Sequence, residues 1–225
     1  MEIADMGSSG EGKFYKHIGD TLAPMSRVLS FLAALMLGVS AWAQDISPDQ
    51  LVQKITVEVL AAIRTDQQLA AGDKQKALKL AEEKVLPYID FEEATRLAVG
   101  RAWARASAEQ KSRLVSEFRN MLVRTYANAV GAYRGQTLTV LPWRAGKDTV
   151  DETTVHTQYI RASGQRLPID FTMRKTDAGW KVFDFVVEGV SLVLTYRSEF
   201  DAVLKQEGVD GLIKRLEQKN TPGTT

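Results

Sequence analysis

The sequence has no cysteine among its 225 residues and only two histidines. A disulfide framework is therefore excluded, and so is a zinc site built from cysteine and histidine. The sequence also lacks a phosphate loop, a dinucleotide fingerprint and a Gly-x-Ser-x-Gly elbow. The carboxylates form no clustered motif that would hold a metal on their own. We expect no metal or cofactor, and a fold that depends on its hydrophobic core.

An excess of charge of either sign is also missing. The chain has 29 lysines and arginines against 28 aspartates and glutamates. Without the three basic and four acidic residues of the first 43 positions, the net charge is +2. Such a balance predicts no strong electrostatic attraction to nucleic acid or to anionic bilayers.

The apolar run near the start of the chain is short. Val28–Val39 follows a single arginine, and small residues at Ala41 and Ala43 occupy the positions that a signal peptidase reads. We expect a secretory signal peptide that starts at Met25 and is cleaved before Gln44. The run is too short for a relaxed membrane span, although a retained N-terminal anchor is the alternative. Residues 1–43 are thus an upstream extension plus signal peptide.

Helical signals fill the chain from residue 47 to residue 134. Three helices are expected first. The first begins with a capping box of Ser47 and Gln50, and the second begins at Asp73 and stops before Pro87. The third begins with a capping box of Asp90 and Glu93 and ends at Gly100. A capping box of Ser107 and Gln110 then opens a long amphipathic helix that runs to Arg134. Its apolar face is unusually aromatic and contains Leu114, Phe118, Met121, Leu122, Thr125, Tyr126, Ala129 and Tyr133.

After Gly135 the hydrophobic period changes from helical to alternating. Strands are expected at 137–141, 149–161, 166–175 and 180–188, with hairpin turns at 163–165 and 177–179. Two helices over 191–207 and 210–218 follow, separated by Gly208, and 220–225 is expected to be a disordered tail. Antiparallel hairpins after a long helix predict an α+β fold in which that helix lies on one face of a curved sheet.

The last two strands carry more apolar residues than a half-solvated sheet needs. In strand 166–175 the apolar residues alternate as expected, but the next strand is apolar on both faces: Phe183, Phe185 and Val187 on one, and Trp180, Val182 and Val186 on the other. Both faces could pack against helices. Alternatively, helix and sheet could leave an apolar cavity lined by residues such as Tyr126, Phe171, Phe185 and Val190. Periodicity does not separate these two alternatives.

Several short segments are recognisable as motifs: Tyr88–Phe91, Leu97–Trp103, Ser107–Lys111, Arg124–Ala127, Glu188–Leu192 and Tyr196–Phe200. In this order they resemble the MlaC family, also called the toluene-tolerance auxiliary family. The resemblance covers nearly all of the chain from Pro48 to Lys219.

The resemblance implies a cystatin-like (NTF2-like) α+β body, with a curved antiparallel sheet against a long helix, plus an added helical subdomain. It implies a single lipid-binding domain over residues 44–219. Family members are periplasmic carriers that shuttle diacyl glycerophospholipids between the two membranes and so maintain outer-membrane lipid asymmetry. Their partners are an inner-membrane ABC transporter with a ring of substrate-binding subunits and an outer-membrane lipoprotein–porin complex.

A deep pocket for acyl chains is also implied, with the lipid headgroup left outside. The family's Gly-Val-Ser turn maps onto Gly189, Val190 and Ser191, and its aromatic position on the long helix maps onto Tyr126. We expect the lipid to be lined by fourteen residues: Leu97, Trp103, Phe118, Leu122, Tyr126, Tyr133, Ile169, Phe171, Met173, Phe183, Phe185, Val187, Val190 and Leu192.

Two other classes of function are alternatives to a carrier. Cystatin-like folds also host small enzymes that use a buried carboxylate and a tyrosine, and the groups available here are Asp170, Asp184, Tyr159 and His156. An acid–base pair would need polar neighbours, which the apolar face around Tyr126 lacks, so we expect no catalysis. An adaptor that binds only proteins fits the last two helices but leaves the apolar strands unexplained.

Overall fold

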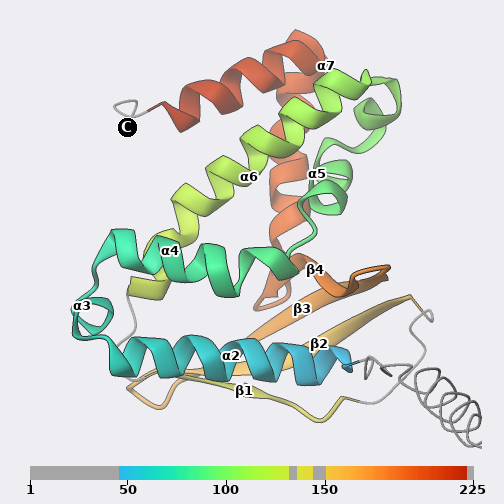
Figure 1. Cartoon of the computed structure of the whole chain (residues 1–225). Coiled ribbons are helices and arrows are strands. Elements are labelled where there is room, and N and C mark those ends of the chain that lie inside the picture. Colours follow the sequence, from blue (N-terminus) through green and yellow to red (C-terminus); the bar gives the residue numbers. More distant parts are fainter. Residues whose placement is uncertain (1–45, 132–135, 144–150, 222–225) are drawn as a thin grey trace, which may run out of the picture. The chain divides into compact units, whose positions relative to one another are not determined.

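The computed structural model describes residues 46–131, 136–143 and 151–221 (Figure 1). The expected signal peptide, Tyr133 and positions 222–225 of the expected tail lie outside the described residues. Within the described part of the chain, no helix is both long and apolar enough to span a bilayer.

The N-terminal helical elements are α2 (Pro48–Thr65), α3 (Gln67–Ala70), α4 (Lys74–Lys84) and the 3-10 turn η1 (Leu86–Tyr88). Helices α2 and α4 begin at the capping residues that the sequence predicts, whereas the short α3 was not predicted. Gln50 Oε1 accepts a hydrogen bond from the Ser47 backbone N–H at 3.3 Å. The Asp73 carboxylate accepts from the first free N–H groups of α4, at 2.9 and 3.0 Å. These bonds satisfy donors that a helix start leaves without an intrahelical partner.

The remaining helices are α5 (Phe91–Val99), the 3-10 segment η2 (Gly100–Arg105), α6 (Ala108–Gly131) and α7 (Leu192–Asn220). The box at the start of α6 is confirmed, because Ser107 and Gln110 exchange hydrogen bonds of 3.0 and 3.1 Å. The predicted break is confirmed too: Gly208 has φ 68° and ψ −167° inside α7. Only glycine adopts this conformation readily, so the helix axis changes direction there.

At α5, half of the expected capping box is wrong. Asp90 caps the Glu93 N–H at 3.0 Å, but the Asp90 N–H donates to the Val182 carbonyl of a strand at 2.7 Å. The Glu93 carboxylate binds Arg96 instead. Arg174, from the sheet, donates to the Asp90 carboxylate at 2.6 Å, which raises the pKa of that guanidinium. The start of α5 is therefore tied to the sheet by an ion pair between the buried Asp90 carboxylate and the half-buried Arg174 guanidinium.

The sheet is a five-stranded antiparallel meander in the order of the sequence. Its strands are β1 (Thr137–Val140), β2 (Glu152–Ile160), β3 (Arg166–Thr176), β4 (Gly179–Val187) and β5 (Val190–Ser191). The first four strands and both hairpin turns match the prediction within a few residues, whereas the two-residue β5 was not expected. The α+β fold class is confirmed.

A β-bulge in β4 corrects the faces assigned to this strand. Asp184 pairs with Thr172 and Val182 pairs with Met173, so Phe183 is the extra residue. A bulge shifts the alternation by one position. Phe185 and Val182 therefore share one face of the sheet instead of lying on opposite faces, and Trp180 and Val187 lie on that same face.

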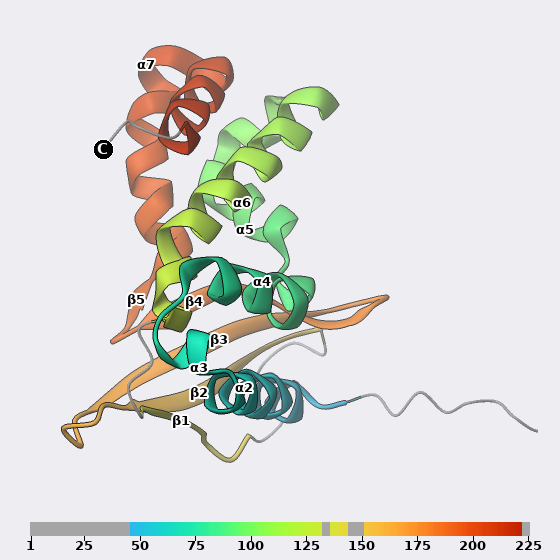
Figure 2. The same cartoon turned by 60° about the vertical axis from the view of Figure 1, so that its left-hand side comes forward.

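Three hydrophobic cores form among the described residues, and they share no member; the smallest joins α2, α3 and α4 through Ile63, Leu69, Ala77 and Leu80. The sheet core contains Leu51 and Val52 of α2 with Val155, Met173 and Val182 of the strands. The helical core joins α5, α6 and α7 through residues such as Leu114, Phe118, Val193, Phe200 and Ile213. Pattern alone placed the long helix 107–134 over the sheet. In Figure 1 it is α2 that lies along the sheet, and Figure 2 shows the same helix nearly end-on beside the strands, while α6 packs with α4, α5 and α7.

Candidate functional site

One face of the sheet changes from fully covered to open along its length. Under α2, Val155 and Met173 are 0% exposed. Towards β5, Phe171 and Phe185 are half-buried, Val187 is 39% exposed and Val190 is 63% exposed. Strand register places these side chains on the same face, because Phe171 pairs with Phe185 and Val187 pairs with Val190. The apolar face thus continues beyond the part that the protein's own core covers.

The turn that presents Val190 is held in a defined conformation. Glu188 and Gly189 have φ values of 50° and 82°, which reverse the chain between β4 and β5. The buried Asp184 carboxylate accepts hydrogen bonds from the Ser191 hydroxyl at 2.5 Å and from the Val193 N–H at 3.0 Å. The Ser191 hydroxyl in turn accepts from the Leu194 N–H. Val190 is therefore exposed on a rigid support rather than on a loose loop.

Aromatic rings form the middle of the open face. The rings of Phe171 and Phe185 meet edge to face, with centroids 5.4 Å apart. This geometry is favourable for aromatic pairs and fixes both rings. Ile169 pairs with Val187 on the neighbouring strands and is half-buried. The result is a continuous apolar surface from the sheet core to the β4–β5 turn.

The first turns of α7 adjoin this surface, because α7 packs against β4 and β5. Leu122 and Leu192 are half-buried at the margin of the helical core. Tyr126 is 46% exposed, and its hydroxyl is hydrogen-bonded to that of Tyr196, which is 8% exposed. Burial and then the bond to Tyr126 raise the pKa of Tyr196 well above its ordinary value. The tyrosine pair links the end of α6 to the first turns of α7.

The raised pKa of Tyr196 predicts a pH dependence. Above the ordinary value of 10.0, the unfolded chain loses this proton while the folded chain keeps it. The free energy of unfolding should therefore fall as the pH rises beyond about 10, since the unfolded state then binds fewer protons. Urea titrations at several alkaline pH values would show a shallower decline for Tyr196→Phe than for the unchanged chain. Equal slopes in both proteins would contradict the assignment.

The fourteen residues expected at a lipid surface fall into distinct groups. Five of them lie on the open face, namely Ile169, Phe171, Phe185, Val187 and Val190, and Leu192 follows at the start of α7. Leu122 and Tyr126 lie on α6, where Leu122 is half-buried and Tyr126 is 46% exposed. Phe118, Met173 and Phe183 are at most 8% exposed, so they lie behind this surface. Leu97 and Trp103 pack on the helical core. Tyr133 lies outside the described residues.

Two of the groups considered for acid–base chemistry lie together, because His156 Nδ1 and Asp170 Oδ1 are 3.0 Å apart, but the His156 side chain is 63% exposed. The Asp184 carboxylate already accepts hydrogen bonds from the Ser191 hydroxyl and the Val193 N–H. Within the described residues, no group of three or more histidines and carboxylates could hold a metal ion.

Comparison with known proteins places the chain in a family. The family model described as "MlaC protein" matches residues 53–218. The chain belongs to the MlaC family. This MlaC chain is similar to the intermembrane phospholipid transport system binding protein MlaC of Haemophilus influenzae, with 24% identity over 85% of this chain and 90% of the relative. It is also similar to the toluene tolerance protein ttg2D of Pseudomonas putida, with 23% identity over 73% of this chain and 76% of the relative.

A solved structure shares the fold of this MlaC chain. The phospholipid-binding protein of Ralstonia solanacearum, solved in complex with a phospholipid, superposes with a TM-score of 0.69 at 34% identity. The match covers 76% of this chain and 96% of the solved one.

Proposed function

We propose that this protein is a phospholipid carrier that binds acyl chains on the open apolar face between β3–β5, the end of α6 and the start of α7. The observation that carries the proposal is the rise in exposure along one sheet face, from 0% at Met173 to 63% at Val190. A contiguous exposed apolar surface is costly in water and marks a ligand or partner site. The solved phospholipid complex of a relative supports lipid as that ligand.

The physical need for a carrier follows from the cost of exposing acyl chains. A diacyl lipid has about thirty methylenes, and each costs about 0.8 kcal/mol to expose to water. The total exceeds roughly 20 kcal/mol, which prevents useful spontaneous crossing of an aqueous space. A surface of valine, leucine and phenylalanine offers the chains surroundings close to those of a bilayer. The free-energy change of lipid transfer between membrane and carrier is then close to zero, and the transfer needs no catalytic group on this chain.

The cellular setting is part of the same proposal. We expect export through the signal peptide, a periplasmic mature chain that starts at Gln44, and shuttling that maintains outer-membrane lipid asymmetry. An inner-membrane ABC transporter with its substrate-binding ring and an outer-membrane lipoprotein–porin complex are the proposed partners. Direction would come from relative affinities and from the transporter's ATP.

Native mass spectrometry tests the binding function. Protein purified from bacteria under mild conditions should carry diacyl phospholipid in stoichiometric amount, and organic extraction should remove that mass. The extracted lipid is identified by tandem mass spectrometry. Identical masses before and after extraction would contradict the carrier proposal and would favour an adaptor that binds only proteins.

A further inference from the structure

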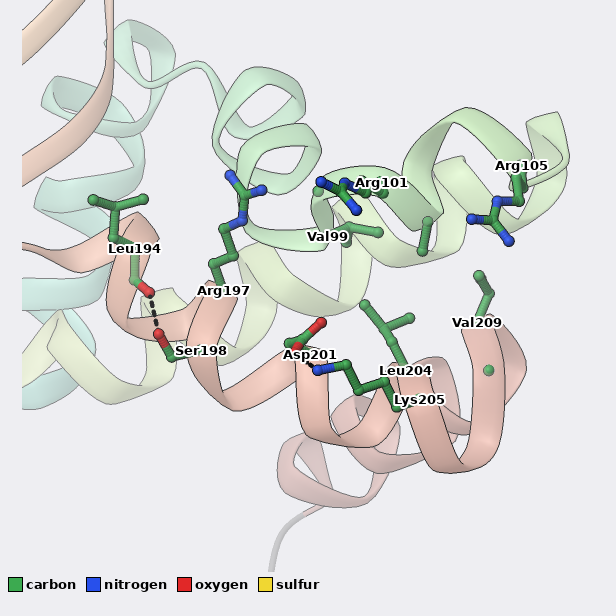
Figure 3. Close-up of a pocket in the computed structure, with 13 residues that line it drawn as sticks. Val99, Arg101, Arg105, Leu194, Arg197, Ser198, Asp201, Leu204, Lys205 and Val209 are labelled. Carbon is green, nitrogen blue, oxygen red and sulfur yellow. Dashed lines mark hydrogen bonds and ion pairs between the residues drawn. The ribbon is translucent and has the colours of Figure 1, made fainter.

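A concave site lies on the helical side of the molecule, and its lining contains none of the residues proposed to bind lipid tails. It is a hollow of about 950 Å³ between η2 and the first half of α7 (Figure 3). One wall is formed by residues 99–102 and Arg105, and the other by eight residues of α7 that lie between Leu194 and Val209. Arg101 and Arg197 lie in the motif segments Leu97–Trp103 and Tyr196–Phe200.

Three arginines at this hollow have no carboxylate partner. Of the residues that the structure describes, none forms an ion pair within 4.0 Å of Arg101, Arg105 or Arg197. Asp201, the one acidic residue of the lining, is engaged by Lys205 at 2.5 Å. The positive charge of the hollow is therefore not neutralised from within.

Arginines elsewhere in the helical part are of both kinds. Arg96 pairs with Glu93, Arg113 with Glu217 and Arg215 with Glu207. Arg64, Arg119 and Arg124 form no ion pair among the described residues, but they do not line the hollow. What distinguishes Arg101, Arg105 and Arg197 is that they line one hollow together, in a chain that is nearly neutral overall, with 29 basic and 28 acidic residues.

The floor of the hollow is apolar. Val99 is buried, Ala102, Leu204 and Val209 are half-buried, and Leu194 at the rim is 57% exposed. Arg197 lies against the backbone of Gly100, where a β-carbon would come within 3.3 Å of its Nε atom. Glycine at this position therefore lets the guanidinium lie close to η2, on the same side of the hollow as Arg101.

We propose that this hollow docks an acidic, amphipathic segment of a partner protein. Guanidinium groups pair with carboxylates in a fixed, often bidentate geometry, and the apolar floor suits the hydrophobic side of such a segment. The volume is that of a site for several side chains rather than for a single small anion. A flat bilayer surface cannot reach the floor of a concave site. This docking site goes beyond lipid binding and uses different residues.

Site-specific photo-crosslinking in the cells that normally make the protein tests this site. A benzophenone amino acid replaces Ser198, which lines the hollow and is exposed; the control replaces Ser163, exposed on the β2–β3 turn. The Ser198 probe should give one protein adduct whose cross-linked segment is rich in Asp and Glu. The double change Arg101→Glu with Arg197→Glu should lower the yield of this adduct at least tenfold, whereas Arg161→Glu should leave the yield unchanged. Reversing the charge of the cross-linked partner segment should restore the adduct of the double variant.

The remaining outcomes overturn the proposal. They are no adduct at Ser198, an adduct only with lipid or with a second copy of this chain, or a partner segment without carboxylates. Binding of purified protein to phosphatidylglycerol vesicles that is lost in the double variant, without a protein adduct, would assign the arginines to a membrane surface instead. The double variant should still carry phospholipid in native mass spectrometry, so failure of docking and failure of lipid binding are distinguishable.

Discussion

Replacing Val190 with glutamate is expected to remove bound phospholipid from the purified protein. The side chain is 63% exposed at the open end of the apolar face, so a carboxylate there would have to lose water against acyl chains. Burying a charge without a partner costs about 3 kcal/mol or more, which corresponds to about a hundredfold loss of affinity. Native mass spectrometry should find the variant almost entirely free of lipid.

The matched control for this change is Val57→Glu. Val57 is 54% exposed on α2 and lies outside the proposed lipid surface. Both variants add the same charge at an exposed valine, so both should remain folded by circular dichroism. Only Val190→Glu should lose lipid. Equal retention of lipid by the two variants would remove the β4–β5 turn from the proposed site.

Phe118→Ala is expected to lower the free energy of unfolding by about 3–5 kcal/mol. The Phe118 side chain is 1% exposed, and its ring contacts those of Tyr196 and Phe200 edge to face, with centroids 5.1 and 5.2 Å apart. Truncation removes both contacts and leaves a cavity in the helical core. Because small domains are stable by only about 5–15 kcal/mol, this is a large share of the total. Urea denaturation measures the loss.

Phe171→Ala provides the contrast to this core substitution. Phe171 is half-buried, and we place it in the lipid surface rather than behind it. Its truncation should cost less stability than Phe118→Ala, while lowering the amount of bound lipid more. The reverse order for both measurements would show that Phe118 contacts lipid and that Phe171 belongs to the core.

Local structure was largely predictable from short segments. The caps at Ser47, Asp73 and Ser107 and the break at Gly208 occur where the sequence predicts them, because each depends on bonds or backbone angles within a few residues. The order of the first four strands was predictable for the same reason. The prediction of a capping box at Asp90 was half wrong, because the Asp90 N–H donates to the carbonyl of Val182, a residue distant in the sequence.

Other features depended on contacts that no local pattern contains. The extra residue at Phe183 follows from the pairing of β4 with β3, and it moved Val182 and Phe185 onto one face. Periodicity alone assigned these residues to opposite faces. The grouping of Arg101, Arg105 and Arg197 likewise exists only because η2 and α7 enclose a common hollow.

By itself, the sequence determined the long helices, the first four strands and their order, the α+β class and the family to which the chain belongs, whereas the short α3 and β5 were not predicted. These features depend on residue spacing within short segments and on the order of motifs along the chain. Only the tertiary structure decided which apolar residues the protein covers and which it leaves open. Leu114 and Tyr126 occupy the same predicted helix face, yet Leu114 is 0% exposed and Tyr126 is 46% exposed. Coverage depends on which other element packs against each residue, and residue spacing does not encode that.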